Sequence, residues 1–174
     1  STPAQAVETK ASYALLIDAE TGVALFEKNA DARMSPASMS KLMTVLMAFE
    51  ALESGAVTDE EAFFVSDDAW RRGGASSGGS TMFLKARSRV SVLDLLRGVI
   101  IQSGNDACIA LAEGLAGSEP AFAELMTERA QELGMTRSNF VNSTGLPDPE
   151  HKTTARDLAT LARELINNHA DYYR

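Results

Sequence analysis

One stretch constrains the fold more than any other, and it reads Ser35-Pro36-Ala37-Ser38-Met39-Ser40-Lys41-Leu42-Met43-Thr44-Val45-Leu46-Met47-Ala48-Phe49. After a cap-like Ser35 and an early proline, apolar residues recur at helical intervals until Gly55, which predicts a helix over residues 38–54. Residues three apart in a helix are neighbours on one face. The sequence therefore places the Ser38 hydroxyl and the Lys41 amine on the same face, about one turn apart.

This spacing suits a serine nucleophile and its base. A serine hydroxyl reacts well only when a neighbouring group takes its proton, and a lysine can do so if its pKa is lowered. The apolar run after Lys41 indicates partial burial, and the positive end of a helix disfavours an ammonium and could bind an oxyanion through the Ser38 N–H. The alternative is a helix cap beside a solvated lysine, because Ser-x-x-Lys also occurs by chance. A solvated helix would carry more charge than residues 42–48, so we favour the nucleophile and base.

A second motif lies downstream. The pattern predicts an apolar helix over 92–102, then Ser103-Gly104-Asn105, then another helix over 106–116. A turn held between two buried helices can present a hydroxyl for proton relay and an amide for a substrate carbonyl. Taken alone, the motif is more typical of an ordinary helix–helix turn, in which glycine and asparagine are common.

Together these motifs resemble one family, the low-molecular-mass penicillin-binding proteins, and specifically the D-alanyl-D-alanine carboxypeptidases. The resemblance covers about residues 13–165 and rests on three segments: Pro36-Ala37-Ser38-Met39-Ser40-Lys41-Leu42-Met43-Thr44, Met82-Phe83-Leu84 and Gln102-Ser103-Gly104-Asn105-Asp106-Ala107-Cys108.

The resemblance implies a role for each matching position. Ser38 would be the acylated nucleophile, Lys41 the general base, Ser103 the proton relay and Asn105 a ligand for the substrate's amide, with Ser80 bordering the cleft. The implied reaction removes the terminal D-alanine from peptidoglycan stem peptides through an acyl-enzyme, and β-lactam antibiotics would acylate the same serine. The implied location is the periplasm or the outer face of the cytoplasmic membrane.

The expected fold class is α+β, the transpeptidase fold of penicillin-binding proteins and β-lactamases, with an antiparallel sheet covered by helices and a helical lobe. Residues 11–18 and 23–27 alternate as a hairpin joined through Glu20-Thr21-Gly22. Further helices are expected over 120–133 and 154–168. The glycine-rich stretch 72–80 is expected to be a flexible, little-packed surface loop, because it lacks the Gly-Lys-Ser/Thr ending of a phosphate loop.

One family motif is missing. Lys-Thr-Gly should lie on an edge strand of the main sheet, but Lys152-Thr153-Thr154 precedes a helical pattern, and one of its threonines is better interpreted as a helix cap. We therefore expect residues 1–174 to be the N-terminal part of one catalytic domain, incomplete at the C-terminus. Its expected partners include its own missing C-terminal segment.

Two alternatives stay open. A class A-like β-lactamase shares the serine–lysine helix, and Glu164 with Asn168 imitates its added base, although a pair on a helix surface explains this spacing better. A non-catalytic peptidoglycan-binding fragment would bind stem peptide without acylation of Ser38.

Composition excludes other classes. A formal net charge of −8 argues against nucleic acid as a partner, and the local basic residues Arg71, Arg72, Lys85, Arg87 and Arg89 are interpreted as solvated.

Several kinds of site and segment are not indicated by the sequence. Neither a metal site nor a cofactor motif is visible, and Cys108 is expected to be a buried small hydrophobe. Residues 1–6 lack the features of a signal peptide, which the resemblance implies has been removed.

Overall fold

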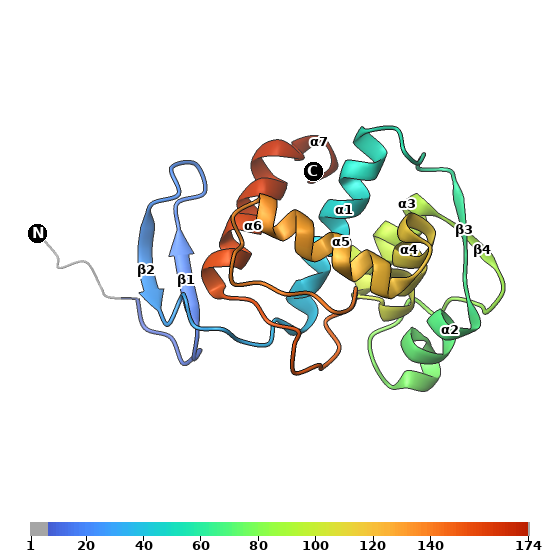
Figure 1. Cartoon of the computed structure of the whole chain (residues 1–174), viewed down its shortest axis with the longest axis horizontal. Helices are drawn as coiled ribbons and strands as arrows, with labels where there is room; N and C mark the ends of the chain where they lie inside the picture. The colour runs from blue at the N-terminus through green and yellow to red at the C-terminus, as the bar shows by residue number, and fades with distance from the viewer. Residues whose placement is uncertain (1–6, 174) are drawn as a thin grey trace, which may run out of the picture.

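The computed structural model describes residues 7–173 (Figure 1), so the interpretation of residues 1–6 lies outside the described part. Its elements follow in the order β1 (Ala14–Ile17), β2 (Ala24–Lys28), η1 (Ala37–Ser40), α1 (Lys41–Glu53), β3 (Ala62–Phe64), α2 (Asp67–Gly73), η2 (Ala75–Ser77), β4 (Arg89–Ser91), α3 (Val92–Gln102), α4 (Asn105–Ala116), α5 (Glu119–Glu132), α6 (Ala155–Asn168) and α7 (Ala170–Tyr173). No helix in this part is long and apolar enough to cross a membrane.

The predicted hairpin is confirmed. β1 pairs antiparallel with β2, and Asp18 holds the turn by accepting the Thr21 N–H at 2.6 Å. Two arginines of α6 tie the hairpin to the helices, since Arg156 contacts Glu27 (2.9 Å) and Arg163 donates to the Ala19 carbonyl (3.1 Å). The hairpin stands at one end of the molecule beside α6 (Figure 1). A second two-stranded sheet, β3 with β4, was not predicted, and it lies at the opposite end.

The core is helical and centred on α4. Residues Asp106–Ala112 of this helix are buried without interruption, and α1, α2, α3 and α5 all pack against it. Burial of each large apolar side chain, such as Leu95, Leu111 or Met126, stabilises the fold by about 1.5–3 kcal/mol. The sequence predicted α3, α4, α5 and α6 to within one residue at each end and α1 except at its start, but it did not predict α2 or α7. At the start of α1 the first turn is the 3-10 helix η1, and Ala37 at its start has a left-handed backbone (φ 49°). No side chain caps the N-terminus of η1, so the prediction that Ser35 is a helix cap is wrong.

The glycine-rich stretch is only partly a surface loop. Residues 75–80 are exposed as expected, but Arg72 and Gly73 end α2, and Gly73 and Gly74 are buried. A Cβ atom on Gly73 would lie 2.2 Å from the Asp106 backbone nitrogen, so this glycine permits α2 to approach α4 closely. The neighbouring arginines are paired rather than simply solvated, because Asp68 accepts from both Arg71 and Arg72.

Candidate active site

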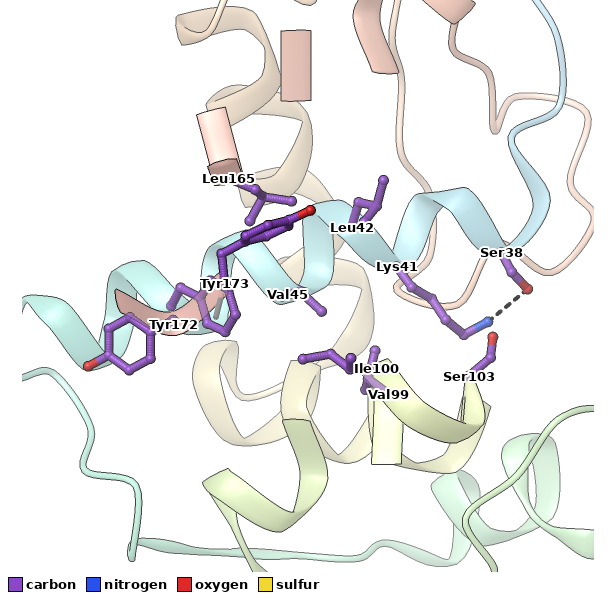
Figure 2. A pocket seen from close by; sticks show the side chains of 11 residues that line it. Ser38, Lys41, Leu42, Val45, Val99, Ile100, Ser103, Leu165, Tyr172 and Tyr173 are labelled. Carbon is purple, nitrogen blue, oxygen red and sulfur yellow. Dashed lines mark hydrogen bonds between the residues drawn. The ribbon is translucent and has the colours of Figure 1, made fainter. Parts of the chain in front are cut away.

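Ser38 and Lys41 lie where the sequence predicted. The Ser38 side chain is exposed at the start of η1, and Lys41 opens α1 with only 6% of its surface exposed. The Lys41 Nζ lies 3.1 Å from Ser38 Oγ and donates to the Thr144 carbonyl at 2.8 Å (Figure 2). The nucleophile candidate is therefore reachable from solvent while its neighbouring amine is buried.

Burial lowers the pKa of Lys41 below its ordinary value. A Cys108 thiolate would oppose this, but burial raises the pKa of that thiol to about 12, so Cys108 stays neutral and burial dominates. A neutral Lys41 amine keeps two N–H groups and one lone pair. It can then donate to Thr144 and accept the Ser38 proton across the same 3.1 Å contact.

Ser103 lies across the pocket from this pair. It ends α3 in a left-handed conformation (φ 54°), which is uncommon for a residue other than glycine, and its hydroxyl points toward the Lys41 amine (Figure 2). Backbone conformations of this kind persist where the surrounding structure holds them. The turn here is fixed by the Gly104 N–H, which donates to the Gly98 carbonyl at 3.0 Å.

Asp106 organises this turn, a role that was not predicted from the sequence. Its buried carboxylate accepts hydrogen bonds from the N–H groups of Met82, Leu84 and Ala107 at 2.9–3.0 Å, and from the Thr81 hydroxyl at 2.8 Å. One side chain therefore joins the segment 81–84 to the first turn of α4, where a carboxylate is also favoured by the helix dipole. The adjacency of Asp106 to the Ser-Gly-Asn motif was the available signal.

Asn105 and Ser80 lie next to each other at the start of α4. The Asn105 N–H donates to the Ser80 carbonyl at 2.8 Å, and its side chain approaches Gly79. Among the described residues the Asn105 side chain makes no hydrogen bond to another side chain, and Ser80 is exposed. Neither residue lines the pocket that contains Ser38.

A tight turn over residues 142–146 supports the start of η1 from outside. Gly145 has φ +83°, and a Cβ atom there would lie 1.8 Å from the Ala37 carbonyl oxygen, so no other residue fits. The Asn142 side chain accepts the Gly145 N–H at 2.8 Å, and the Ser143 carbonyl accepts the Thr44 hydroxyl at 2.7 Å. The turn thus touches the peptide just before Ser38 and carries the carbonyl that holds Lys41.

His151 connects to the same peptide through Ser40. The Val141 N–H donates to Nδ1 of His151 (3.0 Å), so the neutral ring carries its proton on Nε2 and donates to Ser40 Oγ (2.7 Å). Ser40 in turn donates to the Ala37 carbonyl at 2.8 Å. Burial is the largest cause that lowers the pKa of His151, which keeps the ring neutral. This connection was not predicted, because it joins residues 111 positions apart.

Glu119 supports the other side of the turn. Its buried carboxylate accepts from the N–H and the hydroxyl of Ser143 at 3.0 and 2.7 Å and pairs with Arg72 at 2.7 Å. The turn is therefore fixed to α2 and α5 as well as to α1. A site fixed in this way is preorganised, because its groups need little rearrangement before reaction.

The pocket itself has a volume of about 310 Å³ and runs from Ser38 along α1. Its floor is apolar, and its far end is formed by Tyr172 and Tyr173 of α7 (Figure 2). Lys152-Thr153-Thr154 does not line it. Thr154 instead caps α6 by accepting the Asp157 N–H at 3.0 Å, which confirms the cap prediction.

Glu164 does not imitate a lactamase base here. It pairs with Asn168 on α6 (2.7 Å), as the spacing predicted, and it does not line the pocket.

This chain is similar in sequence and in fold to known proteins. The D-alanyl-D-alanine carboxypeptidase DacC of Escherichia coli K12 is 44% identical over 160 residues, which are 91% of this chain and 40% of that protein. The structure of penicillin binding protein 5 from Haemophilus influenzae is similar with a TM-score of 0.92 and 36% identity, over 98% of this chain and 49% of that one. An ampicillin-bound penicillin-binding protein D2 from Listeria monocytogenes has a TM-score of 0.77 at 29% identity, over 97% of this chain and 66% of that one.

The fold and the serine–lysine pair define a protein of the penicillin-binding class, in an α+β fold. More narrowly, residues 1–174 match the peptidase S11 family, described as D-alanyl-D-alanine carboxypeptidase, and the chain belongs to that family. The chain spans about two fifths of the length of the relatives it matches, with 39–44% of each covered.

Proposed function

We propose that this protein, at its natural length, is a serine-type D-Ala-D-Ala carboxypeptidase that forms an acyl-enzyme on Ser38. The observation that carries the proposal is the buried Lys41 amine, whose pKa is lowered by burial, 3.1 Å from an exposed serine hydroxyl. Membership of the D-alanyl-D-alanine carboxypeptidase family supports the choice of substrate, a peptidoglycan stem peptide that ends in D-Ala-D-Ala.

The proposed chemistry has two halves. In the first, Lys41 accepts the Ser38 proton as Oγ attacks the carbonyl carbon of the penultimate D-alanine, and the Ser38 N–H at the start of η1 donates to the developing oxyanion. Collapse breaks the peptide bond, and the leaving amine of the terminal D-alanine takes a proton relayed through Ser103. In the second, water attacks the ester, restores the serine and releases the shortened peptide.

Asn105 and Ser80 are proposed to contact the substrate. Asn105 is proposed to bond the substrate's amide, because its side-chain amide makes no hydrogen bond within residues 7–173, and Ser80 is proposed to border the cleft beside it. β-Lactams are proposed to acylate Ser38, in line with the ampicillin-bound Listeria relative. The proposed place of action is outside the cytoplasmic membrane, in the periplasm or on the membrane's outer face.

A further C-terminal segment is proposed to complete the site. The hairpin leaves apolar side chains in solvent, with Leu16 46% and Leu25 63% exposed, and the Lys-Thr-Gly motif is not among residues 1–174. Additional strands against this surface would bury it and supply the second oxyanion donor. In this proposal residues 1–174 are the N-terminal part of one catalytic domain.

The test is release of D-alanine from a peptide ending in D-Ala-D-Ala, catalysed by the protein at its natural length. Ser38→Ala is expected to lower kcat/KM by at least about 1,000-fold, as for loss of other serine nucleophiles. Ser35→Ala removes an exposed hydroxyl of the same stretch and should leave the rate unchanged. Undiminished release by Ser38→Ala would show that the nucleophile lies elsewhere.

The lifetime of the penicilloyl adduct separates the alternatives. A carboxypeptidase holds the adduct for a long time, a class A-like β-lactamase hydrolyses it rapidly, and a peptidoglycan-binding module never forms it. The position of Glu164, outside the pocket, favours the carboxypeptidase over the lactamase.

A further inference from the structure

One buried nitrogen outside the pocket has no hydrogen-bond partner in the described part of the chain, and it is Nε2 of His169. His169 lies between α6 and α7 and is only 5% exposed. Its other nitrogen, Nδ1, lies 2.9 Å from the carboxylate of Glu53. When Nδ1 donates its proton to Glu53, Nε2 presents a lone pair to the protein interior.

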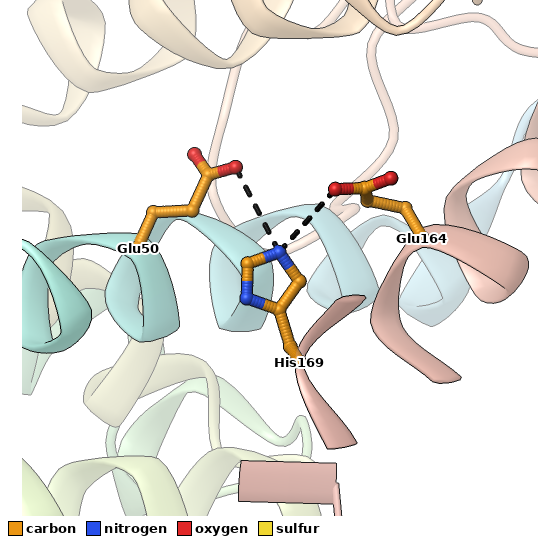
Figure 3. Close-up of side chains that lie close together, drawn as sticks. All are labelled: Glu50, Glu164 and His169. Atoms are coloured by element: carbon orange, nitrogen blue, oxygen red, sulfur yellow. Dashed lines mark ion pairs between the residues drawn. The ribbon is translucent and has the colours of Figure 1, made fainter. Parts of the chain in front are cut away.

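That lone pair faces two carboxylates. Nε2 lies 3.4 Å from Glu164 Oε1 and 3.9 Å from Glu50 Oε1 (Figure 3), and the three atoms lie within 4.8 Å of one another. A lone pair and two carboxylate oxygens that converge in this way form a donor set that a metal cation can bind. We propose that Glu50, Glu164 and His169 form a binding site for a divalent cation of the zinc class. This site does not depend on the proposed carboxypeptidase activity.

The separation between His169 and Glu164 suits zinc. Ligand atoms at about 2.0–2.1 Å from a tetrahedral zinc lie about 3.3–3.4 Å apart. The separation of 3.4 Å between His169 Nε2 and Glu164 Oε1 matches this value, and Glu50 must approach by about half an ångström to meet it. Calcium and magnesium prefer sets of oxygen ligands, so the imidazole nitrogen favours zinc over them. Three protein ligands leave a fourth position for water.

Each ligand is also held by an outer partner. Asn168 donates to Glu164 Oε2 at 2.7 Å, which leaves Oε1 for the metal, and Glu53 fixes the ring of His169. Arg129 donates to Glu50 Oε1 at 2.7 and 3.0 Å and to Oε2 at 3.2 Å, so Oε1 must leave the first two contacts to bind a metal while the third can persist. Partners of this kind orient the ligands of known metal sites.

The ligands come from three elements, which indicates a structural role. Glu50 belongs to α1, Glu164 to α6 and His169 to the junction before α7, so a bound ion would hold α7 against α1. On α7, Tyr172 stacks on Phe49 of α1 with ring centroids 5.1 Å apart, and both rings line the far end of the pocket. The ion would therefore fix that end of the pocket.

The experiment is calorimetric titration of the metal-free protein, at its natural length, with zinc chloride. We expect one zinc per chain, with binding weakened at least tenfold by His169→Gln and by Glu164→Gln. Glu132→Gln is the matched control, because this exposed glutamate pairs with Arg129 but offers no ligand, and its affinity should stay within twofold of wild type. Cobalt should give the strong visible absorption of tetrahedral coordination in the wild type.

Two results would overturn the proposal. They are no zinc binding by folded wild-type protein, and an unchanged affinity in folded His169→Gln. Either would mean that these three side chains do not form a metal site. Circular dichroism checks the fold of each variant, and Glu164→Gln decides the matter if His169→Gln does not fold.

Discussion

Replacing Gly145 by alanine tests whether the turn at 142–146 holds the peptide that precedes Ser38. The added Cβ atom would lie 1.8 Å from the Ala37 carbonyl oxygen, which is a backbone atom and cannot simply rotate away. Gly134 provides a matched control, because its φ of +84° is nearly the same as the +83° of Gly145 while nothing lies within 4 Å of its Cβ position.

The two variants should differ by the clash alone. A left-handed alanine costs about 1–2 kcal/mol of the free energy of unfolding in both. At Gly145 the Cβ atom and the carbonyl must also separate by more than about 1 Å, and overpacking of this kind costs a further 1–3 kcal/mol or so. The displaced Ala37 carries Ser38 with it, and a shift of about 1 Å at a reacting group can lower a rate roughly 100-fold.

The assays are urea denaturation and the second-order rate of acylation by a penicillin, measured on the protein at its natural length. Gly145→Ala should lose stability by more than Gly134→Ala and should acylate about 100-fold more slowly. Gly134→Ala should acylate at the wild-type rate. If folded Gly145→Ala acylates as fast as the control, the turn does not position the nucleophile.

Three further predictions concern the groups around Ser38. Lys41→Arg should slow acylation at least about 100-fold, because a guanidinium stays protonated and cannot accept the Ser38 proton. In the wild type the acylation rate should rise with pH as the Lys41 ammonium loses its proton, and this rise should occur at a lower pH than the ordinary pKa of lysine, because the pKa of Lys41 is lowered. The free energy of unfolding should fall as the pH drops below about 6.5, because His151 takes up a proton in the unfolded chain but not in the folded state, where its pKa is lowered. In urea denaturation at pH 7.5 and 5.5, His151→Gln should reduce the difference in the free energy of unfolding between the two pH values. Asp106→Asn should cost at least about 2 kcal/mol in the same assay, because one amide oxygen cannot serve four donors, whereas the exposed Asp94→Asn should cost less than about 0.5 kcal/mol.

Local sequence patterns were sufficient for the five longer helices and for the nucleophile pair, but not for the short helices α2 and α7. Val92–Gln102 was predicted with its observed bounds, because its apolar periodicity ends at a glycine turn. Ser38 and Lys41 are three residues apart on adjoining turns, so their proximity follows from helical geometry alone. Thr154 was likewise recognisable as one of the possible caps.

Contacts between distant segments were not accessible in this way. The glycines at 73 and 74 suggested a flexible loop, yet they are buried because α4 passes against α2, a tertiary contact that no local pattern encodes. The link from His151 to Ser40 spans 111 positions, and Glu50 and Glu164 meet only because α6 packs against α1. Ligand spacing in the sequence could not reveal a site whose members come from three elements.

The most direct test of the account is the intact mass of the protein, at its natural length, before and after incubation with a penicillin, followed by peptide mapping. We predict one penicilloyl group on Ser38 in the wild type and none in Ser38→Ala. A penicilloyl group on another residue, or continued labelling of Ser38→Ala, would contradict the assignment of Ser38 as the nucleophile.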